Sequence, residues 1–316
     1  MPEIYDIAII GGGPAGLTAG LYASRARMKT VLIERMVCGG QMLITDTIEN
    51  FPGFPGGIKG PELADWMFKQ AGRFGLEVKS LEAKGLVLKD KESDPFLVGL
   101  TDEAKLEALS VIISTGATWN SLGIPGEKEL TGRGVSYCAT CDGPIFKGKD
   151  VAVIGGGDTA LEDALFLAKF AAKVTIIHRR DRFRGTKILQ ERILANHKIE
   201  VRFNSVAVAV TGERKCEALE IKDVNTGAAG SIKASGVFVL IGMAPNSGIF
   251  KPVIKTDDKG YILCDDDMKT SASGIFACGD VRCKSLRQVV TAAGDGATAA
   301  FSAQHYVERL KGVEYK

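Results

Sequence analysis

Apolar runs and stretches of helical periodicity alternate along the chain, and one arrangement of them occurs twice. An apolar run at residues 7–10 is followed by a glycine-rich turn, a segment of helical pattern at 14–27 and a second apolar run at 30–34. The same succession starts again with the apolar runs 151–154 and 174–177, the first of which also leads into a glycine-rich turn. Short apolar runs joined through one helix are typical of parallel sheets. Each repeat therefore predicts a strand–turn–helix–strand unit.

The remaining segments extend these two units. Residues 108–115 predict a buried strand, residues 236–242 predict the strand that closes the second unit, and a helix is expected from 287 to about 310. Two stretches, 39–41 and 49–56, are punctuated by glycine and proline and show neither period, so we expect loops at a ligand-binding edge. The predicted fold class is α/β, with two Rossmann-like three-layer domains.

The first glycine-rich turn has the spacing of a dinucleotide-binding loop. Residues 11–16 read Gly-Gly-Gly-Pro-Ala-Gly. Glycines let the backbone approach a pyrophosphate, and the N-terminus of the following helix offers free N–H groups. Glu34 ends the next strand, where an acid can accept hydrogen bonds from ribose hydroxyls. A glycine turn without a ligand is the alternative interpretation. The residues expected to bind the nucleotide are Gly11, Gly13, Pro14, Ala15, Gly16 and Glu34.

The second turn, residues 155–160, repeats this register with a different residue at the end of the strand. Glu34 follows Gly13 by 21 residues, and His178 follows Gly157 by the same 21. A carboxylate there repels a 2′-phosphate, whereas guanidinium groups can bind its oxygens in a fork. The first site therefore fits FAD and the second NADPH, with a solvated basic turn as the alternative. The residues expected to bind NADPH are Gly155, Gly157, Asp158, Thr159, Ala160, His178, Arg179, Arg180 and Arg184.

The order of these segments predicts that one domain is inserted into the other. We expect a discontinuous FAD-binding domain at 1–117 and 246–316, and an NADPH-binding domain at 118–245. The chain of 316 residues is long enough for two domains with separate cores. Two crossings, near 117 and 245, make a hinge possible, and we expect rotation about them to alternate two conformations.

A Cys-x-x-Cys lies between the two turns, with Cys141 only 14 residues before Gly155. Cys138 and Cys141 can be a redox pair, half of a zinc site or two separate core thiols. Zinc needs four ligands, and the chain has no second Cys-x-x-Cys and only 3 histidines. Asp142 follows directly and can supply the proton that a leaving thiolate needs. This favours a redox pair, with Cys138, Cys141 and Asp142 as catalytic residues and no metal.

Composition limits the remaining functions. Hydrophobic residues make up 45% and charged residues 25%, as in globular proteins. A net charge of +2 favours neither a nucleic acid nor a membrane as partner, and no apolar run approaches the roughly 20 residues of a spanning helix. The first strand is expected almost at the N-terminus and Asp6 interrupts its apolar residues, so we expect no signal peptide. Seven scattered cysteines do not form a secreted disulfide framework, and we expect the protein in the cytoplasm.

Taken together, these motifs resemble the low-molecular-weight thioredoxin reductases over essentially the whole chain. An ordered set of motifs is far more specific than any one of them. The segments that carry the resemblance are 11–16, 39–41, 49–53, 138–142, 155–160, 178–180 with Arg184, 241–246, and 279–280 followed by 287–288.

The resemblance implies an NADPH-dependent thioredoxin-disulfide reductase (EC 1.8.1.9) that contains FAD, forms a homodimer and acts on thioredoxin or a thioredoxin-like protein. It implies that Asp280 lies at the ribityl or pyrophosphate part of FAD and that Cys141 faces the flavin while Cys138 attacks the substrate. Arg287, Gln288 and Val289 are expected beside the isoalloxazine. Further FAD contacts are expected at Gly40, Gln41, Asn50, Thr115, Gly116 and Gly279, and NADPH contacts at Ile241 and Gly242.

Three other functions stay open at this point. An alkyl hydroperoxide reductase flavoprotein shares these domains but carries an N-terminal extension with its own dithiol, whereas this sequence starts at the first strand. A flavin-dependent thiol oxidase needs no NADPH, which the arginines argue against. A non-catalytic redox-binding protein need not keep both cysteines beside Asp142. Leu286 departs from the family, which often has an aromatic residue there, and this affects only local flavin contacts.

Overall fold

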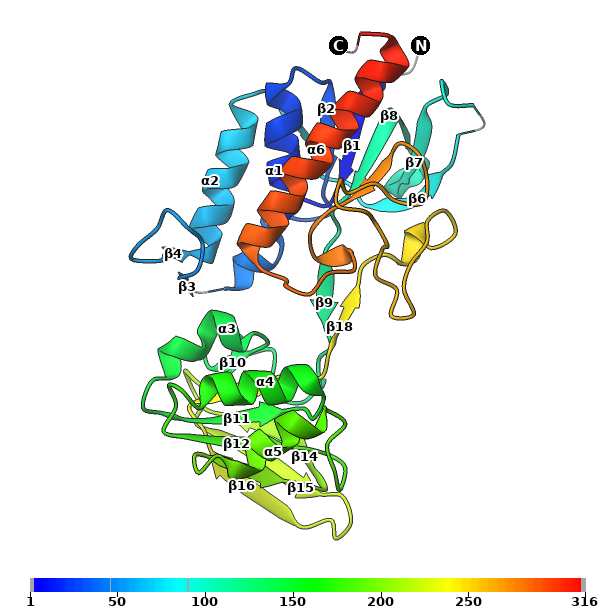
Figure 1. Ribbon diagram of the computed structural model, residues 1–316. Coiled ribbons are helices and arrows are strands. Elements are labelled where there is room, and N and C mark those ends of the chain that lie inside the picture. The colour runs from blue at the N-terminus through cyan, green and yellow to red at the C-terminus, as the bar shows by residue number, and fades with distance from the viewer. Residues whose placement is uncertain (1–2, 46, 90, 314–316) are drawn as a thin grey trace. The chain divides into compact units, whose positions relative to one another are not determined.

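The computed structural model describes residues 3–45, 47–89 and 91–313, and it divides into two compact units (Figure 1). Unit 1 combines the chain up to Thr118 with the chain from Ala244, and unit 2 is Trp119–Met243. These divisions lie one and two residues from the domain boundaries expected above.

Unit 1 is built on a seven-stranded sheet in the order β5-β2-β1-β8-β7-β6, with β19 also paired to β8. The neighbours of β1 and β8 are parallel except β7, which joins β6 as an antiparallel extension. The sheet confirms the predicted strands at 7–10, 30–34 and 108–115. The strand bounds are β1 (Ile4–Ile10), β2 (Thr30–Ile33), β5 (Glu77–Lys79), β6 (Ala83–Val87), β7 (Phe96–Leu100), β8 (Lys105–Ile113) and β19 (Ile275–Ala277).

Three helices cover one face of this sheet. They are α1 (Pro14–Arg25), α2 (Gly60–Gly72) and α6 (Val289–Lys311), and α1 lies between the other two (Figure 1). The alternation along β1 explains the two faces, because Ile7 and Ile9 pack among the helices whereas Ala8 and Ile10 belong to the core on the opposite face. The predicted helices at 14–27 and 287–310 are confirmed to within two residues.

Short elements shape the edge where the carboxyl ends of the strands lie. The segment 39–41, predicted as a loop, instead enters a 3-10 helix, Gly40–Ile44, because Gly39 and Gly40 adopt φ of 135° and 56° and Met42 is buried. The other short elements of unit 1 are β3 (Thr47–Ile48), β4 (Ile58–Lys59) and the 3-10 helices Thr101–Glu103, Gly248–Phe250 and Gly279–Val281.

Unit 2 repeats the architecture with a five-stranded parallel sheet in the order β10-β17-β11-β12-β13 and an antiparallel sheet, β14-β15-β16. The strand bounds are β10 (Val135–Ser136), β11 (Asp150–Ile154), β12 (Lys173–Ile177), β13 (Ile199–Arg202), β14 (Ser205–Thr211), β15 (Ala218–Asp223), β16 (Ala229–Lys233) and β17 (Gly236–Val239). The helices are α3 (Ala139–Asp142), the 3-10 helix Gly143–Phe146, α4 (Asp158–Leu167) and α5 (Lys187–Ala195).

The chain passes between the units along β9 (Ala117–Trp119) and β18 (Met243–Pro245), which pair with each other. Two predicted strands end early before these crossings. The strand at 108–115 ends at Ile113 because the Ser114 hydroxyl bonds the Ile10 and Gly11 carbonyls and starts a turn. The strand at 236–242 ends at Val239. Among the described residues, none of the helices has the length and apolarity needed to span a membrane.

Candidate functional site

The first glycine loop is held close to the sheet by contacts that leave no room for a side chain at Gly11 or Gly16. Gly11 has φ of 109°, and a Cβ there would lie 2.5 Å from the Ser114 carbonyl oxygen. A Cβ on Gly16 would lie 1.9 Å from the Gly11 carbonyl oxygen. Gly13 caps α1 without a side-chain hydrogen bond, and a Cβ there would meet nothing within 4 Å. The N-terminus of α1 is thus open to a ligand.

Glu34 anchors this loop from the end of β2. Its Oε2 accepts a hydrogen bond from the Gly12 N–H at 2.7 Å, and its Oε1 accepts one from the Met36 N–H at 3.0 Å. Cys38 lies below the loop, since its Sγ is 2.8 Å from where a Cβ of Gly12 would be. Burial and the nearby Glu34 carboxylate raise the pKa of the Cys38 thiol to about 11. Cys38 is therefore a protonated thiol at neutral pH.

The carboxyl end of β8 brings together predicted residues from distant segments. The Thr115 hydroxyl donates to the Asn246 carbonyl at 2.7 Å, and the Asn246 amide donates to the Thr115 carbonyl at 2.9 Å. The Gln41 amide donates to the Ala117 carbonyl. Gly116, with φ of 67°, makes the turn between these contacts. Gln41, Thr115 and Gly116 therefore share one edge of the sheet.

Asp280 lies in the 3-10 helix Gly279–Val281, which packs on the first loop. Gly279 has φ of 76°, and a Cβ there would lie 2.8 Å from the Cβ of Ala15. Burial raises the pKa of the Asp280 carboxyl, against the lowering effect of Lys284 and Arg287. Its buried Oδ1 has no hydrogen-bond partner among the described residues. A hydroxyl of a ligand beside α1 would satisfy this oxygen.

The segment before α6 is fixed by polar contacts. Arg287 lies over the Tyr261 ring, 4.1 Å from its centroid, and its Nε donates to the Asp280 carbonyl at 3.3 Å. Gln288 caps α6 in a capping box, and its Oε1 accepts from the Asn50 amide at 2.8 Å. The structure thus places Asn50 next to the 287–289 segment, where Val289 is the first residue of α6.

Asp295 is a residue of this site that sequence reasoning missed. Its Oδ2 accepts from the Gly279 N–H at 3.1 Å and from Lys284 Nζ at 2.8 Å, and its Oδ1 lies 3.7 Å from Arg282 Nη1. It therefore holds the backbone next to Asp280 in place. The only signal in the sequence is an acid within a helix of small residues, 289–300, which by itself indicates nothing about a partner.

The second glycine loop, in unit 2, is open at the corresponding position. Gly157 caps α4 without a side-chain hydrogen bond, and a Cβ there would meet nothing within 4 Å. Gly155, by contrast, would place a Cβ 2.5 Å from the Leu240 carbonyl oxygen. The Arg184 N–H donates to the Gly156 carbonyl at 2.8 Å, and the Thr186 N–H donates to Asp158 Oδ1 at 2.7 Å. The segment that carries Arg184 is thus attached to the loop.

The residues after β12 divide into one buried and two exposed side chains. His178 lies beneath the loop, because a Cβ on Gly156 would be 2.2 Å from its Nδ1. Burial lowers the pKa of His178, and its Nε2 has no partner among the described residues. Arg179 and Arg180 are exposed, as is Arg184. His178 is therefore buried beneath the loop, whereas the three arginines that the sequence analysis assigned to the same nucleotide contact are exposed to solvent.

The other residues expected at this nucleotide site lie around the same loop. Thr159 is exposed in the first turn of α4, and Ala160 is fully buried. Ile241 is 38% exposed beyond the end of β17. Gly242 has φ of 104°, and its carbonyl accepts from the Asn120 N–H at 3.0 Å.

The Cys-x-x-Cys forms a disulfide at the start of α3. Cys138 and Cys141 are bonded, with their Cα atoms 5.3 Å apart, and both are partly exposed. Asp142 ends the helix, and its Oδ2 accepts a hydrogen bond from the Ser136 hydroxyl at 2.6 Å. A partly exposed disulfide with a carboxylate at its side is suited to thiol–disulfide exchange. The pairing excludes two separate core thiols in this state.

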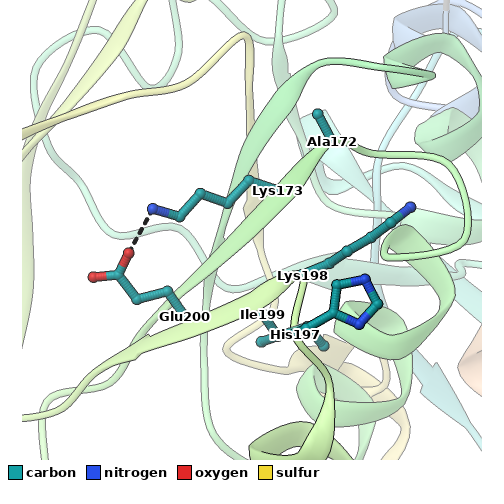
Figure 2. Close-up of a pocket in the computed structure, with 6 residues that line it drawn as sticks. All are labelled: Ala172, Lys173, His197, Lys198, Ile199 and Glu200. Atoms are coloured by element: carbon teal, nitrogen blue, oxygen red, sulfur yellow. Dashed lines mark ion pairs between the residues drawn. The ribbon is translucent and has the colours of Figure 1, made fainter.

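A pocket of about 510 Å³ lies elsewhere in unit 2, between the start of β12 and the start of β13 (Figure 2). Lys173 Nζ pairs with Glu200 Oε2 at 2.6 Å, and Lys198 Nζ donates to the Ala168 and Ala171 carbonyls at 3.1 and 3.2 Å. Its charged groups are thus already paired, and it contains none of the predicted site residues. The lining residues are Ala172, Lys173, His197, Lys198, Ile199 and Glu200.

Comparisons with known proteins agree with this geometry. The profile of the pyridine nucleotide-disulphide oxidoreductase family matches residues 5–296. A thioredoxin reductase of Bacillus subtilis (strain 168) is 47% identical over 310 residues, covering 98% of this chain and 96% of that protein. One of Treponema pallidum (strain Nichols) is 47% identical over 311 residues, covering 98% and 100%.

The same likeness holds among solved structures. The crystal structure of thioredoxin reductase from Streptococcus pyogenes MGAS5005 has a TM-score of 0.93 and 45% identity, covering 98% of this chain and 100% of that one. The predicted α/β fold and the resemblance drawn from the motifs are confirmed. The chain belongs to the pyridine nucleotide-disulphide oxidoreductase family and, within it, to the thioredoxin reductases.

Proposed function

We propose that this protein reduces the disulfide of thioredoxin, or of a thioredoxin-like protein, with electrons from NADPH that pass through FAD (EC 1.8.1.9). The observation that carries the proposal is the partly exposed Cys138–Cys141 disulfide with Asp142 beside it. It is supported by two open glycine loops, one in each unit, and by relatives named thioredoxin reductase.

The residues of unit 1 fit FAD. The uncapped N-terminus of α1 would hold the pyrophosphate, and the unpartnered Oδ1 of Asp280 would accept a hydroxyl of the ribityl chain. Arg287, Gln288 and Val289 would adjoin the isoalloxazine. Bound FAD would supply the two-electron chemistry that no amino-acid side chain provides.

The residues of unit 2 fit NADPH. Gly155, Gly157 and the start of α4 would hold its pyrophosphate, and the exposed Arg179, Arg180 and Arg184 would bind the 2′-phosphate. His178 would take part indirectly, because its ring supports Gly156 from below.

The dithiol chemistry follows from the arrangement of α3. Opening the Cys138–Cys141 bond takes up two electrons and leaves two sulfur anions, one of which receives a proton from protonated Asp142. Cys138 as thiolate then attacks one sulfur of the partner disulfide, forming a mixed disulfide, while the other partner sulfur leaves as a thiolate and takes a proton from water. Cys141 returns to Asp142 the proton that it had received and, as a thiolate, attacks Cys138. This restores the intramolecular disulfide, and the second partner sulfur leaves and takes its proton from water, so that the partner is released as a dithiol.

The proposal also includes a homodimer in the cytoplasm, without a nucleic acid or membrane as partner. The small net charge of +2 supports the absence of a nucleic acid or membrane as partner, and the five cysteines outside disulfides among the described residues support the cytoplasm. The homodimer is proposed from the resemblance to the family.

Serine substitutions at the two cysteines test the function most directly. Cys138→Ser and Cys141→Ser should each abolish NADPH-dependent thioredoxin reduction, because neither leaves a dithiol. Both variants should keep FAD, measured by absorbance, and should still be bleached by NADPH under anaerobic conditions. Cys216→Ser is the control, since Cys216 is a buried thiol of unit 2 outside any disulfide. Near-normal turnover with thioredoxin in either cysteine variant would refute the role of the pair.

A further inference from the structure

Ser136 connects the two chemical groups of the redox segment. Its hydroxyl donates to Asp142 Oδ2 at 2.6 Å, and its oxygen accepts the Cys138 N–H at 3.1 Å. Its oxygen also lies 3.3 Å from the Cys138 carbonyl. Since a hydroxyl has one proton, the shorter bond to the carboxylate is the stronger of its two possible donations.

The strand that carries Ser136 is a rigid support. Ser136 is 5% exposed and is the last residue of β10, where it pairs with Phe238 of β17. Val135, which precedes it, and Phe238, which lies opposite it, are each no more than 1% exposed. Functional groups are held more accurately by sheet residues than by loops. The hydroxyl therefore has a fixed position relative to the parallel sheet of unit 2.

The opposite side of α3 is held by α4. The Asp163 carboxyl accepts a backbone hydrogen bond from Ala139, which is fully buried in the same core cluster as Ala160, Leu161 and Ala164. A Cβ on Gly143 would lie 3.1 Å from Leu167, so the segment after α3 is also packed closely on α4. With the backbone seated in this way, the hydrogen bond from the Ser136 hydroxyl helps to orient the Asp142 side chain.

We propose that Ser136 is a positioning residue that holds the Asp142 carboxylate and the Cys138 backbone in one register during disulfide exchange. The inference rests on the proposed function and adds a residue to it. When protonated Asp142 gives its proton to a sulfur, the carboxylate that forms receives the Ser136 O–H. When Asp142 takes a proton back, the hydroxyl turns away from it, so that Ser136 neither gains nor loses a proton over the cycle.

A hydrogen-bond donor stabilises an ionised carboxylate and so lowers the pKa of the carboxyl group. Removing the Ser136 hydroxyl should therefore move the acid limb of the pH–rate profile to higher pH. In the described part of the chain, the titratable groups beside α3 include Asp142 itself, the two cysteines, Asp163 and Glu162 on α4, and Tyr137 after β10. Burial raises the pKa of Asp163 to about 6, and that of Tyr137, which donates to Glu127, to about 12. Asp163 is thus the group that a pH experiment must separate from Asp142.

The test compares Ser136→Ala with Ser136→Thr, which keeps a hydroxyl, and with Ser205→Ala as the matched control. Ser205 is a buried serine of unit 2, 6% exposed, whose hydroxyl donates to the Phe203 carbonyl at 2.9 Å. Loss of a hydrogen bond to a charged group corresponds to a fall of about 10- to 100-fold in kcat/KM for thioredoxin in Ser136→Ala. Flavin reduction by NADPH should not change, and Ser136→Thr should recover most of the rate.

The double variant Ser136→Ala/Asp142→Asn decides whether Ser136 acts through Asp142. If it does, the double variant is no slower than Asp142→Asn alone, because coupled residues are not additive. Asp163→Asn, which keeps an acceptor for Ala139, should leave the shift caused by Ser136→Ala in place. Additive effects, or an acid limb that does not move in Ser136→Ala, would overturn the proposal.

A readout without turnover keeps this inference separate from the proposed function. In protein reduced with dithiothreitol, alkylation of Cys138 by iodoacetamide is followed against pH by mass spectrometry. A carboxylate freed from Ser136 raises the energy of a nearby thiolate, so Ser136→Ala should shift this profile to higher pH, and Ser205→Ala should not. An unshifted profile contradicts the role of Ser136. Failure of the unmodified protein to reduce thioredoxin contradicts only the function proposed above.

Discussion

The two glycine loops have the same backbone plan and differ in what lies beneath them. In each unit a glycine without a side-chain cap opens the helix, and an earlier glycine touches the end of a neighbouring strand. In unit 1 the residue at the end of the second strand is Glu34, whose carboxylate binds the Gly12 N–H. In unit 2 it is His178, whose ring packs under Gly156. A carboxylate therefore binds the first loop by a charge-assisted hydrogen bond, whereas an imidazole ring fills the space beneath the second.

A second difference concerns how closely the helix approaches the strand. Gly16 of α1 leaves no space for a Cβ, whereas Ala160 occupies the corresponding position of α4 and is fully buried. The loop of unit 1 is therefore the tighter one. The shared spacing predicts a nucleotide loop, while the residues around the loop determine which nucleotide would fit and how much substitution it tolerates.

The largest effect is expected from adding one methyl group at the tighter loop. Gly16→Ala places a Cβ against the Gly11 carbonyl, which should cost about 1–3 kcal/mol and displace the loop, so that most FAD is lost. Absorbance of the purified protein measures the flavin, and thermal unfolding measures the stability. Ala160→Gly in the looser loop should cost only about 1 kcal/mol of helix stability and keep FAD. Full flavin content in Gly16→Ala would show that the first loop accepts a Cβ at this position.

The next effect concerns the charges that distinguish the loops. Replacing Arg179 and Arg180 with alanine removes charge-assisted contacts of about 1.5–3 kcal/mol each, so the preference for NADPH over NADH should fall by roughly tenfold or more. The ratio of kcat/KM for the two nucleotides measures it. Arg192→Ala, at an exposed arginine of α5, is the control for the loss of a surface positive charge away from these two positions. If the preference survives, the phosphate is recognised elsewhere.

The smallest effect concerns the histidine beneath the second loop. Because burial lowers the pKa of His178 below its ordinary value of 6.5, the unfolded chain binds more protons than the folded protein just below that pH. The free energy of unfolding should therefore fall as the pH drops from 6.5 through the lower pKa of folded His178. Denaturant unfolding of His178→Gln should show a weaker fall over this interval. The exposed His197→Gln should behave as the unmodified protein does.

The parts that the sequence determined are those governed by neighbours along the chain. Strand and helix periods, the glycine spacing of both loops and the Cys-x-x-Cys followed by Asp142 are local features, and the strands and helices lie within a few residues of their predicted bounds. Glycine is required at Gly11 by a positive φ and a close carbonyl, which the motif alone indicates. These features depend only on residues that are close together in the sequence, so they can be predicted without knowing the fold.

The tertiary structure decided the contacts between segments that lie far apart in the chain. Asn50 meets Gln288 across 238 residues, and Thr115 meets Asn246 across 131. Asp295 reaches the Gly279 backbone, and His178 turns under its loop while the arginines beside it face solvent. Ser136 meets Asp142 only because the chain turns back at α3. The sequence pattern does not predict such pairs. A polar side chain bonds to whichever group the folded chain brings within hydrogen-bond distance, and this depends on the packing of distant segments.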